Sequence, residues 1–111
     1  MEIELLVTPD CPHAPTAADL ITTAVADTRI RATISQTTIN SEEQARNRAF
    51  TGSPTILLNG VDPFARPDAP VGLVCRLYLT SDGPRGVPGI RELRQAMKEA
   101  AAHQSGLRKR G

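Results

Sequence analysis

Two short apolar runs, each joined to a proline-containing segment, most constrain how this 111-residue chain can fold. Ile3 to Val7 is followed within a few residues by Asp10-Cys11-Pro12-His13, and Gly52-Ser53-Pro54-Thr55 leads directly into a second run that ends at Leu58. Continuous apolar runs of this length, bounded by Pro and Gly, are typical of strands buried on both faces. The two runs therefore predict central strands, with a thiol after the first and an X-Pro bond before the second.

Three other stretches have the periodicity of amphipathic helices. The first is predicted from near Pro12 to about Asp27, where apolar residues recur at helical spacing. The second opens at Ser41-Glu42-Glu43-Gln44, a capping-box pattern, and runs to about Phe50, with Gly52 placed to end it. The third has Pro88 in its first turn, and its apolar stripe consists of Ile90, Leu93, Met97 and Ala100.

The remaining segments predict two further strands and one long loop. Arg29 to Ile39 is rich in Ile and Thr and suits an edge strand. Asp62 to Gly72 carries three prolines and is predicted to be a loop with Phe64 as its anchor. Leu73 to Leu79 alternates in character and is predicted to be a strand. Its expected core-facing side chains are Leu73, Cys75, Leu77 and Leu79, and its other face carries Val74, Arg76 and Tyr78.

The predicted order of elements is β-α-β-α-β-β-α. The first two strands are joined by a helix and are expected to be parallel. The last two are joined by a loop without a helix and are expected to be antiparallel. We therefore predict an α/β fold with a four-stranded mixed sheet of order 2-1-3-4 and helices on both of its faces.

Composition argues against several classes of function. A net charge of +1 speaks against an electrostatic grip on nucleic acid or acidic membranes, and the sequence offers no zinc or phosphate-loop pattern, so no cofactor is expected. The length predicts one domain, residues 1–103, followed by a disordered basic tail at 104–111. The first residues do not resemble a signal peptide, and no stretch reaches transmembrane length. We therefore expect a cytoplasmic protein with reduced thiols.

Cys11 is the candidate nucleophile because it stands where a strand gives way to a helix. Free N–H groups and the dipole at a helix N-terminus favour the thiolate, which is both the reactive form and the metal ligand. Pro12 suits the first helical position, and His13 can carry a positive charge, whereas the carboxylate of Asp10 opposes the thiolate. Pro15 cannot donate the first helical hydrogen bond, which favours a later helix start. The alternative is an unreactive loop cysteine.

These segments resemble the thioredoxin superfamily in their element order, in Cys11-Pro12 after the first strand, and in Gly52-Ser53-Pro54-Thr55 before the third. The resemblance implies that the Ser53–Pro54 bond is cis and lies beside the Cys11 sulfur, and that the Ser53 backbone pairs with a bound substrate. Pro12, His13, Ser53 and Pro54 then form the substrate-binding surface around a catalytic Cys11. The runs Asp62-Pro63-Phe64-Ala65 and Cys75-Arg76-Leu77-Tyr78 are similar to small bacterial thioredoxin-like proteins, some named alkylmercury-lyase-like.

The sequence departs from that superfamily at Ala14, where a dithiol oxidoreductase has its second cysteine. A mixed disulfide at Cys11 therefore lacks the usual resolving thiol. The predicted hairpin sets Cys75 opposite Leu57, about 10 Å along the sheet from Pro54, which exceeds the roughly 7 Å between Cα atoms that a disulfide allows. We therefore predict that Cys75 is a buried apolar filler, although a hairpin loop of this length does not fix the register.

Three functions follow. The first is a monothiol thioredoxin-like protein whose Cys11 exchanges with a small or protein disulfide, an external thiol then resolving the adduct. The second is a soft-metal or organomercurial protein that uses Cys11, with Cys75 as a second ligand and Asp10 or Asp62 as a proton donor. The third is a degenerate thioredoxin fold that serves as an interaction module. The sequence does not determine the oligomeric state.

Overall fold

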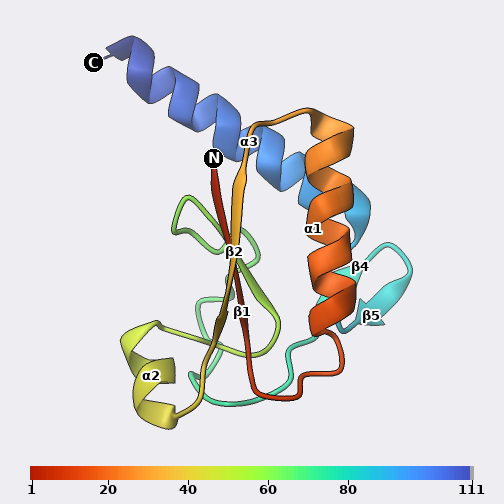
Figure 1. Cartoon of the computed structure of the whole chain (residues 1–111), viewed down its shortest axis with the longest axis vertical. Helices are drawn as coiled ribbons and strands as arrows, with labels where there is room; N and C mark the ends of the chain where they lie inside the picture. Colours follow the sequence, from red (N-terminus) through yellow and green to blue (C-terminus); the bar gives the residue numbers. More distant parts are fainter. Residues whose placement is uncertain (111) are drawn as a thin grey trace.

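The computed structural model describes the backbone of residues 1–110 and the side chains of residues 1–103. Within these residues the chain forms a mixed α/β fold with three helices, a three-stranded sheet and a separate two-stranded sheet (Figure 1). The predicted fold class is therefore confirmed at the level of α/β, but the four-stranded sheet is not present in the described residues.

The main sheet has the order β2-β1-β3. The central strand is β1 (Glu2–Val7), which pairs in parallel with β2 (Thr33–Thr38) and antiparallel with β3 (Thr55–Leu58). In this register Ile3 faces Ile34 on one side and Leu58 on the other. The sequence correctly predicted the central position of β1, the edge position of β2 and their parallel pairing.

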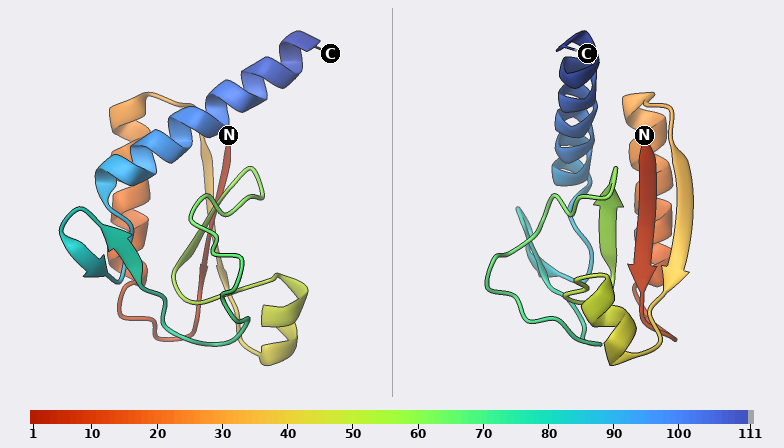
Figure 2. Two further views of the ribbon diagram at one scale, coloured as in Figure 1. Left: turned by 180° about the vertical axis from the view of Figure 1, so that it is seen from behind. Right: turned by 90° about the vertical axis from the view of Figure 1, so that its left-hand side faces the viewer.

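Helices cover both faces of this sheet, as predicted (Figures 1 and 2). On one face, α1 (Ala14–Thr28) and α3 (Ile90–Arg110) pack on alternate residues of β1 and on β3. On the other face, α2 (Glu42–Asn47) and the segment that follows it pack over Leu6 of β1. The larger core consists of Ile3, Leu5, Val7, Ala17, Ile21, Ala24, Ile56, Leu58, Leu93 and Met97, and the smaller one of Leu6, Ile39, Ala45 and Phe50.

The ends of the first two helices follow local chemistry. α1 begins at Ala14, after the N-cap His13, because Pro15 lies in its first turn and has no N–H to donate. At α2, the Ser41 hydroxyl accepts a hydrogen bond from the Gln44 N–H at 3.1 Å, as the capping-box pattern predicted. Gly52 does not end α2, which stops at Asn47 well before it.

The predicted fourth strand, Leu73 to Leu79, is the main error in the predicted fold. Only its last residues are in a strand, β4 (Tyr78–Thr80), and this strand pairs antiparallel with β5 (Gly83–Arg85) in a hairpin of its own. Before the hairpin, the segment touches the main sheet region through one isolated parallel bridge between Ser53 and Cys75. β3 is therefore an edge strand of the main sheet.

From Cys75 to Leu79 the two faces are also exchanged relative to the prediction, whereas Leu73 packs against the smaller core as expected and Val74 is exposed. Arg76 and Tyr78 are buried, with 8% and 4% of their surface exposed, whereas Leu77 and Leu79 are 64% and 75% exposed. The sequence pattern predicted that these two leucines would point into the core, but Arg76 and Tyr78 occupy that position instead. The cause is the hydrogen bonding of Arg76 and Tyr78 described below, which places two polar side chains inside.

The predicted tail covers residues 104–111. The side chains of these residues, and the backbone of residue 111 as well, lie outside the part of the chain that the structure describes. The boundary between a domain at 1–103 and this tail therefore stays a prediction. Over the part of the chain that the structure describes, no helix has the length and apolar character needed to cross a membrane.

We predict that Gly52→Ala lowers the free energy of unfolding more than Gly60→Ala does. Both glycines have positive φ, +137° and +82°, so alanine at either position costs about 1–3 kcal/mol in backbone energy. Only at Gly52 does the added Cβ meet a neighbour, 2.8 Å from the Cβ of Arg76, which adds about 1–3 kcal/mol of overpacking. Urea unfolding measures both variants, and equal losses would contradict the close approach at Gly52.

Candidate functional site

The turn that follows β1 carries Cys11. Its N–H donates to the carbonyl of Thr8 at 3.3 Å, and its own carbonyl accepts from the N–H of Ala14 at 3.2 Å. The side chain is partly exposed and packs against the larger core. Cys11 therefore precedes the N-cap His13 by two residues, and the N–H of Ala14 is already used by a carbonyl. Activation of the thiol by the helix N-terminus stays a prediction.

The Ser53–Pro54 bond is cis, as the resemblance implied. Ser53 is almost fully buried, and its hydroxyl accepts a hydrogen bond from the N–H of Thr8 at 3.0 Å. The carbonyl of Thr8 also accepts a hydrogen bond from the N–H of Cys11. Thr8 therefore joins the turn of residues 8–13, the cysteine turn, to residues 52–54, the proline loop that holds the cis bond. The two sequence segments that predicted the site are thus brought to the same end of the main sheet.

Both backbone groups of Ser53 are occupied by the chain itself. Its N–H donates to the carbonyl of Val74 at 2.8 Å, and its carbonyl accepts from the N–H of Arg76 at 3.0 Å. The resemblance assigned these groups to a bound substrate. In this structure residues 74–76 take that place, so a partner pairs with Ser53 only if this segment moves.

Cys75 is exposed and lies opposite Ser53 rather than Leu57. The predicted register and the predicted burial among leucines are therefore both wrong. The loop of residues 62–72 is long enough to bring the chain back at the start of β3, and the segment then leaves the main sheet to form the β4–β5 hairpin. Cys75 therefore lies beside the proline loop and is not separated from it along the sheet.

A buried cluster around Arg76 holds this segment in place. Its guanidinium pairs with Asp62 at 2.6 Å, donates to the carbonyl of Phe64 at 2.7 Å and to the hydroxyl of Thr55 at 3.2 Å. The side chains of the ion pair are only 7% and 16% exposed. Buried charges need such partners, because an unpaired charge away from water is strongly unfavourable.

Tyr78 connects the same cluster to the proline loop. Its ring lies 4.6 Å below the Arg76 guanidinium and packs edge-on against Phe64, with ring centres 5.5 Å apart. Its hydroxyl donates to the carbonyl of Pro54. Burial raises the pKa of Tyr78, with the charge of Arg76 acting in the opposite direction, so the phenol remains a neutral donor. Phe64 is an anchor of the loop, as predicted.

The structure gives Pro12 and His13 different surroundings. Pro12 is exposed, whereas His13 is partly buried and lies against the turn after β5. A Cβ atom at Gly86 would come within 2.5 Å of the His13 Nε2 atom, so a larger residue there would displace this ring. His13 thus packs the start of α1 against the β4–β5 hairpin. Its role in binding a substrate stays a prediction.

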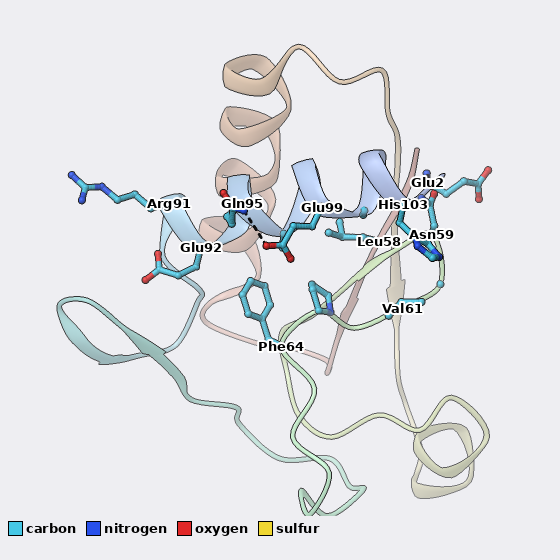
Figure 3. A pocket seen from close by; sticks show the side chains of 14 residues that line it. Glu2, Leu58, Asn59, Val61, Phe64, Arg91, Glu92, Gln95, Glu99 and His103 are labelled. Atoms are coloured by element: carbon cyan, nitrogen blue, oxygen red, sulfur yellow. Dashed lines mark hydrogen bonds between the residues drawn. The ribbon is translucent and has the colours of Figure 1, made fainter. Parts of the chain in front are cut away.

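A separate open groove lies at the other end of the sheet (Figure 3). It has a volume of about 1240 Å³ and runs between α3 and the turn that follows β3. Phe64 and Leu58 form part of its apolar floor, and Glu99 and His103 lie on the helix side. Cys11, Ser53 and Cys75 do not line it, and no sequence pattern predicted it. This groove and the candidate chemistry are therefore in different places.

Both cysteines have free thiols. Among the described residues, no three His, Cys, Asp or Glu side chains are grouped so as to hold a metal ion. Comparison with protein-family models, with curated proteins and with solved structures finds no match for this chain. The functional interpretation therefore depends on the geometry of the site.

Sequence reasoning missed three residues of this region, namely Asp62, Arg76 and Tyr78. Among functional roles, Asp62 was considered only as a proton donor in the organomercurial alternative, and Arg76 and Tyr78 were placed on the strand face that points away from the core. A single alternating segment contains no signal that distinguishes these assignments, because the acidic partner of Arg76 is 14 residues away across the loop.

We predict that Asp62→Ala lowers the free energy of unfolding by about 3–5 kcal/mol, because it leaves the buried charge of Arg76 without its anion. The matched control is Asp27→Ala, which removes an ion pair of similar length, 2.9 Å to Arg94, between side chains that are 40% and 34% exposed. This control is expected to lose at most about 1 kcal/mol. Urea unfolding provides the comparison, and similar losses in both variants would contradict the anchoring role of Asp62.

Proposed function

We propose that this chain is a thioredoxin-like thiol–disulfide exchange protein with Cys11 as its nucleophile. The observation that carries the proposal is the position of Thr8, which hydrogen-bonds to the cysteine turn through its carbonyl and to the Ser53 hydroxyl through its N–H. A thiol and a cis-proline loop are thereby joined at one end of the main sheet. Two segments that are separated by more than 40 residues in the sequence converge there.

The fold supports the same proposal in its element order. The order β1, α1, β2, α2, β3 and the final α3 agrees with the order on which the resemblance to the thioredoxin superfamily was based, but two strands, β4 and β5, stand where one was expected. The difference is the detached hairpin, which leaves β3 as an edge strand. Thioredoxin-like is therefore the finer description that we propose for this mixed α/β fold.

The proposed reaction is exchange with a disulfide. The Cys11 thiolate attacks one sulfur of R–S–S–R, the S–S bond breaks, and one RS⁻ leaves with the bonding electron pair and takes up a proton from water. The product is a mixed disulfide between Cys11 and the remaining R–S group. Exposed Pro12 and partly buried His13 can meet the incoming disulfide directly. Ser53 and Pro54 are buried, and the backbone groups of Ser53 are taken by residues 74 and 76, so in this proposal they contact the disulfide after that segment moves.

A second candidate function is the binding of a soft metal by the two thiols. The exposed position of Cys75 opposite Ser53 favours it, because this position removes the separation that the predicted register placed between Cys75 and the proline loop. Thiolates are the ligands that soft metals prefer. Titration with Hg²⁺ tests this candidate: one ion bound with loss of both free thiols supports it, and one ion for each thiol contradicts it.

We predict that Cys11 forms a mixed disulfide with oxidised glutathione in the Cys75→Ser variant, which isolates Cys11 as the single thiol. If the surrounding residues bind the disulfide, the folded variant reacts about tenfold faster than the same variant in urea, which corresponds to about 1.4 kcal/mol of binding. Intact-mass spectrometry over time measures both rates. The Cys11→Ser variant is the control for reaction at Cys75. A folded Cys75→Ser variant that stays unmodified would refute the proposed function.

A further inference from the structure

We propose that Cys75 is the resolving thiol for Cys11, so that the two cysteines form a reversible intramolecular disulfide. This inference rests on the proposed function, because it needs Cys11 to form a mixed disulfide first. It assigns to Cys75 the role that Ala14 cannot perform.

The first step is the pairing of Cys75 with Ser53. The Ser53 N–H donates to residue 74 and the Ser53 carbonyl accepts from residue 76, so Ser53 and Cys75 are direct partners in a parallel bridge. Direct partners on neighbouring strands project their side chains to the same face, and successive residues alternate between faces. The Cys75 thiol therefore lies on the face to which the Ser53 hydroxyl points.

The burial of the next residue agrees with this assignment. Arg76 is only 8% exposed, whereas Cys75 is exposed. The Arg76 side chain leaves the backbone beside Gly52, where an added Cβ atom would lie 2.8 Å from the Cβ of Arg76. The guanidinium of Arg76 then continues inward to Asp62. The buried cluster thus fixes Arg76 on one face and, by alternation, Cys75 on the other.

Two hydrogen bonds of Thr8 connect Ser53 with Cys11. The Ser53 hydroxyl accepts from the N–H of Thr8, whose carbonyl accepts from the N–H of Cys11. Cys75 and Cys11 are therefore connected through three contacts: the bridge of Cys75 to Ser53, the hydrogen bond of Ser53 to Thr8, and that of Thr8 to Cys11. Both segments lie at the end of the sheet where β1 terminates (Figures 1 and 2).

Both thiols can be reached from solvent. Cys75 is exposed and Cys11 is partly exposed, and both thiols are free. The backbone at Cys75 pairs with the proline loop through one isolated bridge and not through a continuous ladder; the other contacts of the segment there come from the side chains of Arg76 and Tyr78. A small displacement of residue 75 therefore costs few hydrogen bonds, while the Arg76 cluster keeps the segment near the site.

The proposed resolution step is a second thiol–disulfide exchange. The Cys75 thiolate attacks the Cys11 sulfur of the mixed disulfide, the Cys11–S–R bond breaks, and RS⁻ leaves with the bonding electron pair and is protonated by water. Over both steps the substrate disulfide is reduced to two thiols, and the two cysteines are oxidised to one disulfide. The electrons come from the protein dithiol, and an external dithiol is the reductant that regenerates it.

The test compares the full chain with its Cys75→Ser and Cys11→Ser variants after incubation with oxidised glutathione at neutral pH. Intact mass under denaturing, acid-quenched conditions gives the glutathione adduct, and a digest without reduction identifies any Cys11–Cys75 peptide. An intramolecular thiol acts at a millimolar or higher effective concentration. We therefore expect the glutathione adduct on Cys11 to be at least about tenfold less abundant in the unaltered chain than in Cys75→Ser.

The outcomes separate this inference from the proposed function. Loss of two hydrogens in the unaltered chain, with a retained adduct on Cys11 in Cys75→Ser, supports both. An adduct of equal abundance on Cys11 in both proteins overturns the resolving role and leaves the proposed function intact. Disulfide-linked dimers in place of the intramolecular bond also overturn it. Absence of an adduct on Cys11 in folded Cys75→Ser overturns the proposed function itself, whatever forms in the unaltered chain.

Discussion

The buried guanidinium of Arg76 is the interaction on which the arrangement of the candidate site depends. It binds Asp62, the carbonyl of Phe64 and the hydroxyl of Thr55, and so joins the proline-rich loop, the start of β3 and the segment before β4. A buried ion pair is weak support for overall stability, but breaking it by removing one partner is costly. Its consequence here is positional: with Arg76 inside, the residue before it must face the opposite way.

The parts of the fold that the sequence predicted correctly are those in which apolar burial decides the structure. Ile3 to Val7 and Thr55 to Leu58 form strands with mostly buried side chains, and Leu93 and Met97 lie on the buried face of α3 as their spacing indicated. The segment from Leu73 to Leu79 was misassigned because its alternation is equally compatible with either face inside. Hydrogen bonds of Arg76 and Tyr78 with distant residues decided between the faces, and a local pattern does not contain that information.

The candidate site was predictable to a similar extent. Cys11 and the Ser53–Pro54 segment were identified from their places at strand ends, and the structure joins them through Thr8. Cys75 was excluded from the site by a distance that depended on an assumed hairpin register. Because a loop of this length does not fix register, the error moved Cys75 from opposite Ser53 to opposite Leu57. The position of the second thiol was therefore a question of tertiary structure.

We infer that folding brings the Cys11 and Cys75 thiols close together at the end of the main sheet where β1 terminates. The most direct measurement uses a bifunctional alkylating reagent that becomes fluorescent only when both of its arms have reacted with thiols. The rate of fluorescence increase is compared between the reduced, folded protein and the same chain unfolded in urea. The account predicts faster bridging in the folded protein, with both arms on one chain. Bridging that proceeds only after unfolding would show that the fold holds the two thiols apart and would contradict the account.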